Sequence, residues 1–499
     1  MKNIKTLGLI AIVAITALAF STCDNNGGTL PPIWGNWTAF TSLTEEQEIT
    51  RTNNRSGATE KFTGTVSEFL ESRTENTADN PVSLTMQIDL GTMTSADSNW
   101  QKLLGILGTA GRFVDLYLSD CTIANGAGTE FNPVSTVSTG KDKIVSIALP
   151  DTAVSIGPNG NTYNNGAFYN FTVLKSFSGT ALVTIGNYAF YNRENLTMTK
   201  LPSGITSIGN YAFLNCKNLA LTELPAGIEI INESTFSGCE KLALKDLSGI
   251  TSIGNSAFYR CNNLALTKLP PEITSIGNGA FQSCTKLALT ELPAGITSIN
   301  DSTFGGCVNL AMTKLPAGII SIGKSAFSGC DNLALTELPS GIDSISEASF
   351  FHCRNLALTE LPSGVISIGK NAFNTCSKLT LTELPSGVTS IGESAFYSTN
   401  ITLTRLPSGV TIIRDQTFEM CRELTQFTLH SGITSIGHYA FSSCRKLLKV
   451  TFEGTITTFA ISTPFIGDLR EKYLSENGGP GTYTIPDGNV TSPKWTKQQ

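Results

Sequence analysis

Ile273–Leu287 reads ITSIGNGAFQSCTKL, and close copies of this stretch recur along the chain. A phenylalanine returns in every copy after 22 or 23 residues, and most copies carry a cysteine three residues after it. One copy is too short to bury its own apolar side chains, so the copies must stack in register and share a continuous core. The repeated phenylalanines are Phe168, Phe190, Phe213, Phe236, Phe258, Phe281, Phe304, Phe327, Phe350, Phe373, Phe396, Phe418 and Phe441.

Each repeat contains two segments with strand character. After Cys284, the apolar residues Leu287 and Leu289 alternate like a half-buried strand, and Pro293 ends this segment because it donates no ladder hydrogen bond. The short β-branched segment Ile273–Gly277 predicts a second, weaker strand. The residues around each phenylalanine predict a short helical or 3₁₀ turn. The sequence therefore predicts a repeat solenoid of parallel strands joined by such turns.

The leucine spacing of the central repeats breaks strict alternation. Leu219, Leu221 and Leu224 are separated by two residues and then three. Either a bulge lies between the second and third leucine, or the second leucine points outward and Thr222 faces the core.

The string I-T-S-I-G-N-x-A-F-x-x-C-x-x-L, present at 205–219, 250–264 and 273–287, resembles the BspA-like class of leucine-rich repeats of bacterial cell-surface proteins. The resemblance implies a leucine-rich repeat solenoid over 141–453. It also implies an adhesin that engages other bacteria, host cells, or host matrix proteins such as fibronectin and fibrinogen.

The sequence outside the repeats predicts four further segments. A solenoid needs caps over its terminal cores, and Trp100–Leu107 predicts a short helix in the first cap, begun by Asp97 or Ser98 and stopped by Gly108 or Gly111. The predicted organisation is a signal peptide at 1–22, a tether or stalk at 23–80, an N-terminal cap at 81–140, the solenoid at 141–453, and a C-terminal cap and tail at 454–499.

The amino terminus has the order of an export signal. Lys2 and Lys5 precede an uncharged run from Leu7 to Phe20, and small residues follow. Cys23 lies where a lipoprotein signal peptidase would place a lipidated cysteine, although ordinary cleavage after Ala19 is the alternative. We expect an exported lipoprotein, anchored through Cys23 and located at the outer membrane or cell surface.

The cysteine column has three interpretations. Cysteines one turn apart are close enough for disulfides, yet side chains stacked in register point in parallel. A buried free cysteine acts as a small apolar residue, and we favour such a reduced column. A metal site is disfavoured, because the chain has no C-x-x-C pair and only three histidines.

Composition excludes several functions. The chain has 499 residues, with 34 basic and 40 acidic ones, so it offers no basic surface for nucleic acid. The recurring carboxylates, such as Glu291 and Glu337, occupy one repeat position beside Lys268 and Lys314, which predicts a solvated edge. We therefore predict no enzyme, no cofactor and no metal.

Two functions from different classes remain. The chain is either an adhesin or protein-binding scaffold, or a structural envelope-organising protein without a specific ligand. A flat threonine array that orders water is a weaker third possibility. The pair of residues after each phenylalanine varies most between repeats, so we predict a partner-binding edge there, against the alternative of drift at exposed turns. Its residues are Tyr259, Arg260, Gln282, Phe351, His352 and Glu419.

Overall fold

The computed structural model describes residues 35–54, 57–124, 126–134, 139–157, 166–486 and 493–499. The chain forms two compact units, Met1–Leu219 and Ala220–Gln499, called here the N-terminal and C-terminal units. The predicted signal peptide and Cys23 lie outside the described residues.

The N-terminal unit begins with a small folded layer where the sequence predicts a tether. Strands β1 (Gln47–Thr52) and β2 (Thr59–Gly64) pair antiparallel, and helix α1 (Val66–Glu71) follows. Aromatic side chains hold this layer together: the Trp37, Phe40 and Phe62 rings meet the Phe69 ring edge-on, at centroid distances of 5.4, 5.6 and 5.2 Å. Residues 35–54 and 57–80 are therefore folded, where the sequence predicts a stalk.

The helix predicted in the first cap is confirmed. Helix α2 spans Asn99–Ala110, and the Ser98 hydroxyl accepts a hydrogen bond from the Gln101 N–H at 3.3 Å. Gly111 ends the helix in the left-handed region with φ of 65°, a conformation that glycine adopts without steric cost.

Two parallel sheets run through the rest of the N-terminal unit. Their strand orders are β3-β4-β6-β8 and β5-β7-β9-β10. The strands are β3 (Val82–Thr85), β4 (Val114–Tyr117), β5 (Glu130–Phe131), β6 (Ile144–Ala148), β7 (Ser155–Ile156), β8 (Ser176–Ser178), β9 (Thr184–Ile185) and β10 (Ser207–Ile208), and a 3₁₀ turn (Lys141–Lys143) precedes β6.

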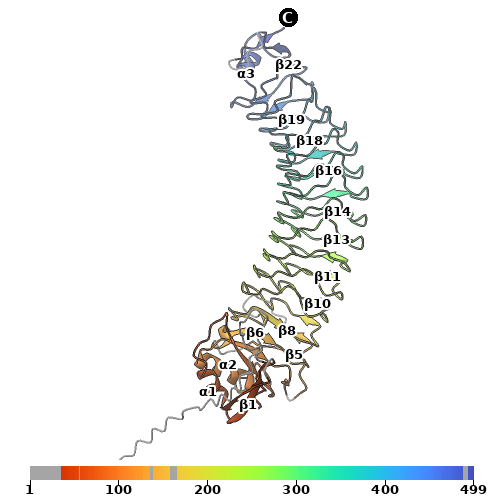
Figure 1. Ribbon diagram of the computed structural model, residues 1–499. Coiled ribbons are helices and arrows are strands. Elements are labelled where there is room, and N and C mark those ends of the chain that lie inside the picture. Colours follow the sequence, from red (N-terminus) through yellow and green to blue (C-terminus); the bar gives the residue numbers. More distant parts are fainter. Residues whose placement is uncertain (1–34, 55–56, 125, 135–138, 158–165, 487–492) are drawn as a thin grey trace, which may run out of the picture. The chain divides into compact units, whose positions relative to one another are not determined.

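The C-terminal unit is a stack of turns that each contribute one short parallel strand (Figure 1). These strands coincide with the Ser-Ile or Ile-Ile pair of the repeat, with the second residue buried in each. They are β11 (Ile230–Ile231), β12 (Ser252–Ile253), β13 (Ser275–Ile276), β14 (Ser298–Ile299), β15 (Ser321–Ile322), β16 (Ser344–Ile345), β17 (Ser367–Ile368), β18 (Ser390–Ile391), β19 (Ile412–Ile413) and β21 (Ser435–Ile436).

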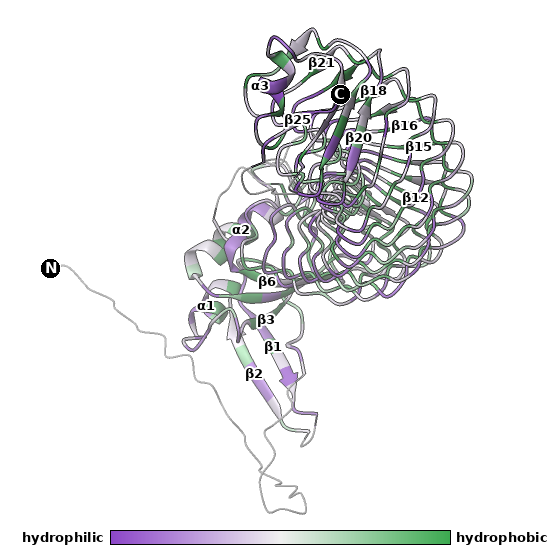
Figure 2. Ribbon diagram, turned by 90° about the horizontal axis from the view of Figure 1, so that it is seen from above, coloured by the Kyte–Doolittle hydropathy of each residue, from purple (hydrophilic) through white to green (hydrophobic). Residues whose placement is uncertain are grey.

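The core of this unit is built from columns of like residues, because the turns lie over one another (Figure 2). The phenylalanine rings form one such column: Phe304 stacks on Phe281 and Phe327 at centroid distances of 5.8 and 5.6 Å, with nearly parallel planes. Leu310 and Cys307 are also fully buried. Burial of many identical apolar contacts, repeated from turn to turn, stabilises the stack.

The leucine segment is the main difference from the predicted fold. In the central repeats it is extended but not a strand, and the chain bends at Thr267 between Leu266 and Leu269. Leu264, Leu266 and Leu269 are all buried while Thr267 is exposed, so the bulge-like interpretation is correct and the outward-pointing leucine is wrong. Regular pairing in this segment returns only in β20 (Gln426–Leu429) and β22 (Lys449–Phe452), where the leucine-like positions alternate.

The segment around each phenylalanine is not the predicted helix or 3₁₀ turn. In the repeats of the C-terminal unit, the residue two positions before the phenylalanine and the residue two positions after it both have positive φ. Around Phe258 these angles are 52° at Ser256 and 57° at Arg260. No right-handed helix accommodates such residues. The turns are instead joined across repeats, since the Arg260 N–H donates to the Gln282 carbonyl at 2.9 Å.

Glycine after the strand isoleucine controls whether neighbouring strands pair. A Cβ on Gly277 would lie 2.5 Å from the Asn255 nitrogen of the preceding turn, so only glycine permits this approach. The Gly277 N–H donates to the Ile253 carbonyl at 2.8 Å, and β12 and β13 pair there.

In the central turns of the C-terminal unit the strand ladder stops where this glycine is replaced, although at the cap Ala460 keeps the pairing and its N–H donates to the Ile436 carbonyl at 2.9 Å. Asn300, Ser346 and Arg414 occupy the glycine position, and the sheets β11-β12-β13, β14-β15, β16-β17-β18 and the sheet that begins with β19 and β21 are separated at those residues. Side chains take over the missing bond in two cases: Asn300 Nδ2 donates to the Ile276 carbonyl and Ser346 Oγ to the Ile322 carbonyl, both at 2.6 Å. We call these three positions the ladder breaks.

Ser346→Gly is expected to close one ladder break. Removing the side chain allows the Asp343 N–H to reach the Ile320 carbonyl. Exchange of the Asp343 amide hydrogen should then slow about fivefold, because one hydrogen bond contributes about 1 kcal/mol of net free energy. Hydrogen exchange followed by mass spectrometry or NMR measures this.

Gly369→Ser is the reverse control, because its Cβ would lie 2.6 Å from the Glu347 nitrogen. The Ile366 amide, which now donates to the Asp343 carbonyl at 2.9 Å, should then exchange faster. An unchanged Asp343 rate in Ser346→Gly means that another feature holds these two turns apart.

The C-terminal end of the stack is covered by a cap. Phe465 stacks on Phe441 at 4.8 Å and extends the phenylalanine column by one ring. Helix α3 (Leu469–Leu474) and strands β23 (Thr458–Phe459), β24 (Gly481–Thr484) and β25 (Thr496–Lys497) complete the cap, with β24 antiparallel to β22 and Trp495 buried.

Candidate functional site

The predicted partner-binding residues lie in two adjacent columns along one edge of the C-terminal unit. We call this edge, formed by the two residues after each column phenylalanine, the Phe edge. Its backbone is rigid, because the second residue of each pair donates to the carbonyl of the first residue in the next turn, as His352 does to Asn374 at 2.8 Å. Side chains of changing chemistry are thus held at regular spacing.

Two of the predicted pairs form compact side-chain clusters. The Arg260 guanidinium carbon lies 5.2 Å from the Tyr259 ring centroid, a cation–π distance, and the Phe351 and His352 ring centroids are 4.2 Å apart. Arg260 is exposed, whereas the other three side chains are half-buried. Aromatic residues and arginine are the side chains that most often dominate protein interfaces.

The structure does not bring all six predicted residues together. Gln282 is one turn from the Tyr259–Arg260 pair, but two turns of small residues, at Gly305–Gly306 and Ser328–Gly329, separate it from Phe351. Together with Gln282, these small residues line a shallow hollow of about 420 Å³. Glu419 lies three turns beyond Phe351, and burial of its carboxylate raises its pKa.

The cysteine column lies directly behind this edge. Nine thiols of the column, from Cys216 to Cys444, donate to the phenylalanine carbonyl of the preceding turn, as Cys284 Sγ does to the Phe258 oxygen at 2.9 Å. That oxygen also accepts the Cys261 N–H at 3.0 Å, so both of its lone pairs are used. Burial raises the pKa of Cys216, Cys307 and Cys421 to about 12.

The described cysteines are all buried free thiols. They are held as neutral donors, and nucleophilic chemistry needs the thiolate. Thr399, which replaces cysteine in one turn, instead donates to the Phe396 carbonyl of its own turn at 2.8 Å and lies 3.4 Å from Cys421 Sγ of the next turn.

The recurring carboxylates form the solvated edge predicted from the sequence. Lys268 and Glu291 lie 3.8 Å apart, and Lys314 and Glu337 lie 3.6 Å apart, each pair joining neighbouring turns. The side chains are highly exposed, so each pair contributes little stability. Over the described ranges, no group of three or more His, Cys, Asp or Glu side chains is arranged to hold a metal ion.

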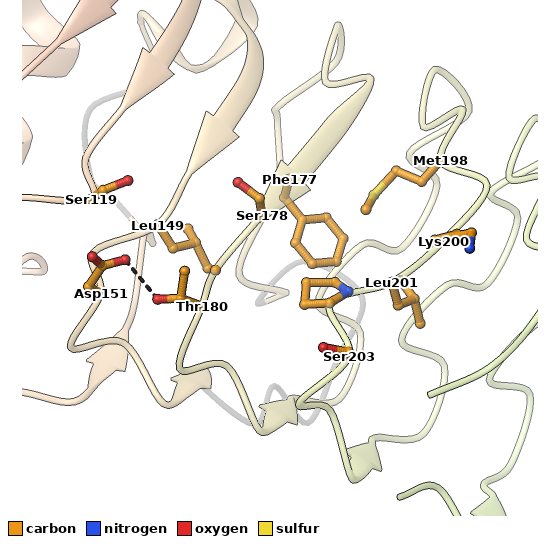
Figure 3. A pocket seen from close by; sticks show the side chains of 12 residues that line it. Ser119, Leu149, Asp151, Phe177, Ser178, Thr180, Met198, Lys200, Leu201 and Ser203 are labelled. Atoms are coloured by element: carbon orange, nitrogen blue, oxygen red, sulfur yellow. Dashed lines mark hydrogen bonds between the residues drawn. The ribbon is translucent and has the colours of Figure 1, made fainter. Parts of the chain in front are cut away.

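A second hollow lies in the N-terminal unit, where the sheet ends at β8 (Figure 3). Its volume is about 360 Å³, and Leu149, Phe177 and Leu201 form its buried apolar part. At the rim, the Thr180 hydroxyl donates to Asp151 Oδ1 at 2.7 Å (Figure 3). Two of the rim's polar groups therefore already satisfy each other.

Sequence reasoning missed two further features of the C-terminal unit. The ladder breaks carry a signal that repeat alignment could find, since asparagine, serine or arginine replaces the glycine after the strand isoleucine. Ile320 and Ile366 are exposed large aliphatic side chains on the strand face, at a position that is threonine in most repeats.

No helix within the described part of the chain is both long and apolar enough to cross a bilayer. The lipid anchor predicted at Cys23 falls outside that part.

Comparisons with known proteins agree with the repeat architecture. A family model described as "BspA type Leucine rich repeat region" matches, with six copies, at residues 140–264, 241–357 and 343–463. No curated protein matches the chain.

Solved structures that are similar include three bacterial proteins. A leucine-rich repeat protein from Bacteroides ovatus is 27% identical, over 56% of this chain and 88% of its own, with a TM-score of 0.38. A leucine-rich repeat protein from T. pallidum is 30% identical, over 38% and 78%, with a TM-score of 0.29. A leucine-rich cell surface protein from Faecalibacterium prausnitzii is 22% identical, over 64% and 79%, with a TM-score of 0.32.

Proposed function

Because the chain belongs to the BspA type leucine-rich repeat family, we propose that it is a protein-binding scaffold at the bacterial cell surface and acts as an adhesin. The observation that carries the proposal is the Phe edge, where a hydrogen-bonded backbone holds aromatic and charged side chains that differ from turn to turn. Repeat solenoids use such extended surfaces to contact macromolecules through many positions at once.

Cys23 is proposed as the lipidated residue that anchors the chain after export. Its support is the order of basic, apolar and small residues before it, from Lys2 to Thr22. A lipid at Cys23 would anchor the repeats to the membrane. At the outer surface of the cell, the anchored repeats would be within reach of partners outside it.

One experiment in two steps tests this role. Intact cells are treated with protease, and released repeat peptides and the Cys23 fragment are identified by mass spectrometry. Adhesin function requires that repeats are released while a lipid-modified Cys23 fragment stays with the membrane. Cleavage only after the envelope is opened would contradict surface exposure and support the envelope-organising alternative.

The second step measures binding of the full chain to a panel of matrix proteins that includes fibronectin and fibrinogen. The test variant combines Tyr259→Ala, Arg260→Gly, Phe351→Ala and His352→Gly. Glycine is used at the two positions with positive φ, 57° and 58°, because Gly306 and Gly329 already occupy the equivalent place in other turns. Loss of these side chains should weaken binding to a recognised partner at least about tenfold.

The matched control changes four exposed threonines on another column, Thr267, Thr290, Thr336 and Thr359, to alanine. It should bind like the unchanged chain. Equal affinities of the Phe-edge variant and the unchanged chain would exclude the Phe edge as the binding surface.

A further inference from the structure

Two exposed isoleucines mark an unusual place on the strand face of the C-terminal unit. Ile320 and Ile366 are 61% and 55% exposed. They lie two turns apart in the column that precedes the strand serine, where other turns carry threonine. That threonine column includes Thr251, Thr274, Thr297, Thr389, Thr411 and Thr434. Since threonine is compatible with this position, packing of the fold does not require isoleucine there.

Asp343 occupies the same column in the turn between the two isoleucines. Its carboxylate accepts a hydrogen bond from the Ser344 hydroxyl at 2.9 Å and forms no ion pair among the described residues. The neighbouring edge of these turns is acidic as well: Glu337 pairs with Lys314 at 3.6 Å, but Glu360 and Glu383 form no ion pair within the described ranges. The surface is therefore apolar at two points and negative between and beside them.

A ladder break also passes between Ile320 and Asp343. In most neighbouring turns, the residue before the strand serine donates its N–H to the carbonyl of the equivalent residue in the preceding turn, as Ile366 does to Asp343 at 2.9 Å. Across the Ser346 break, no hydrogen bond between described residues joins the Asp343 N–H to the Ile320 carbonyl. These two groups face each other across stacked turns that the Ser346 Oγ–Ile322 bond holds together at 2.6 Å, so the break changes the local backbone without exposing a free strand edge.

The break at Asn300 shows which part of this arrangement is special. It leaves the same backbone pair unbonded, between Thr274 and Thr297, but it is flanked by threonines alone. Only the Ser346 break, among those in the described C-terminal unit, combines the unbonded backbone pair with two exposed isoleucines and a carboxylate.

We propose that Ile320, Asp343 and Ile366 form a docking site for a short extended segment of a protein partner that carries an apolar, a basic and an apolar side chain at every second position. The isoleucines would contact the apolar side chains, and Asp343 would pair with the lysine or arginine. The acidic surroundings favour this cationic occupant over a second copy of the chain, which would bring like charges together. The inference rests on the proposed protein-binding role but not on the Phe edge.

The test uses the full chain and a fluorescein-labelled synthetic peptide in which leucine, lysine and leucine alternate with threonine, with binding followed by fluorescence anisotropy at low salt. Ile320→Thr with Ile366→Thr should weaken binding about tenfold, and Asp343→Thr about fivefold with a reduced dependence on salt. Threonine restores the residue that the column carries elsewhere, so these variants keep the fold.

Two controls separate this site from general stickiness. Ile412→Thr removes a 45% exposed isoleucine from another column of the strand face and should leave binding unchanged. A peptide with glutamate in place of lysine should not bind. The proposal is overturned if the Ile320/Ile366 variant binds the lysine peptide as tightly as the unchanged chain, if Ile412→Thr weakens binding equally, or if the glutamate peptide binds as well.

The outcome is independent of the matrix-protein panel. If the unchanged chain binds a matrix protein but these substitutions do not change peptide binding, the docking site is rejected and the scaffold role is retained. Peptide binding that depends on Ile320, Ile366 and Asp343, with no matrix protein bound by the unchanged chain, rejects the adhesin assignment alone.

Discussion

Raising the pH from about 9 towards 11 is expected to unfold the cysteine-bearing turns under reducing conditions. Burial raises the pKa of thiols along the chain above the 9.0 of an exposed cysteine, to about 11 for Cys121 and about 12 for Cys216 and Cys307. Further thiols in the column, such as Cys330 and Cys353, shift in the same direction for the same reason. The folded state therefore keeps protons that the unfolded chain releases.

The sign follows from proton linkage. A raised folded-state pKa gives stability that is complete below the unfolded pKa of about 9 and is lost as the pH rises towards the folded value. Each thiol lowers the free energy of unfolding by about 1.4 kcal/mol per pH unit in that window. If five turns unfold together, their free energy of unfolding would fall by about 7 kcal/mol per pH unit. This is comparable to the whole free energy of unfolding of many domains.

Urea unfolding followed by circular dichroism at a series of pH values measures this slope. The matched variant carries threonine at Cys307, Cys330 and Cys353, as the chain itself does at Thr399, where the hydroxyl bonds the Phe396 carbonyl at 2.8 Å. Lysine and tyrosine titration is common to both proteins. The free energy of unfolding of the variant should fall less steeply with pH, by about 4 kcal/mol per pH unit. Identical slopes for the two proteins would show that the thiols do not govern the alkaline transition.

Phe350→Ala is expected to destabilise the C-terminal unit by about 3–5 kcal/mol. The Phe350 ring is fully buried and stacks on Phe327 and Phe373, both at 5.6 Å, so its loss leaves a cavity within the phenylalanine column. Neighbouring turns depend on the shared stack, and they cannot collapse into the space without losing register.

The chain supplies its own control at the next position. Phe351 has the same side chain but lies half-buried on the Phe edge against His352, so Phe351→Ala should cost less than about 1.5 kcal/mol. Urea midpoints of the two variants at neutral pH test the pair. Similar losses for both would mean that the column is not the principal source of stability.

The repeat pattern was sufficient to predict which residues form the core. The phenylalanine, leucine, isoleucine and cysteine columns follow from period alone, because identical turns place like residues over like. Helix α2 could also be predicted, since its caps depend on local residues such as Ser98 and Gly111.

Only one of the two predicted strand segments is confirmed, since β13 (Ser275–Ile276) lies within Ile273–Gly277, whereas the leucine segment is not a strand. Leu264, Leu266 and Leu269 all face the core, and a spacing of two and then three forces the backbone to bend where a strand would continue straight. The pairing segment is instead the Ser-Ile pair, and its continuity depends on the clearance between a Cβ and the preceding turn. That clearance is a property of two stacked turns, so no single repeat reveals it.

The folded layer at the start of the chain was missed for a different reason. Its composition, rich in threonine, glutamate and asparagine, is typical of a tether, and its few large side chains lie far apart in sequence. Trp37 and Phe69 meet only after the hairpin closes. At the candidate site, the sequence located the variable edge, but the order of turns separates Phe351 and Glu419 from the Tyr259–Arg260 pair.

The ladder breaks bear on how the C-terminal unit would respond to a pulling force. A protein tethered to one surface and bound to another is loaded along its stack, and strand hydrogen bonds resist that load only where they are continuous. At Asn300, Ser346 and Arg414 the strands are not paired, so adjacent blocks are held there by core packing and by the backbone bonds of the Phe edge, such as Gly329 N–H to the Phe351 carbonyl at 2.7 Å. Each of these seams has fewer backbone bonds to break than the paired turns on either side, so under tension the stack would part there first while each block stays folded.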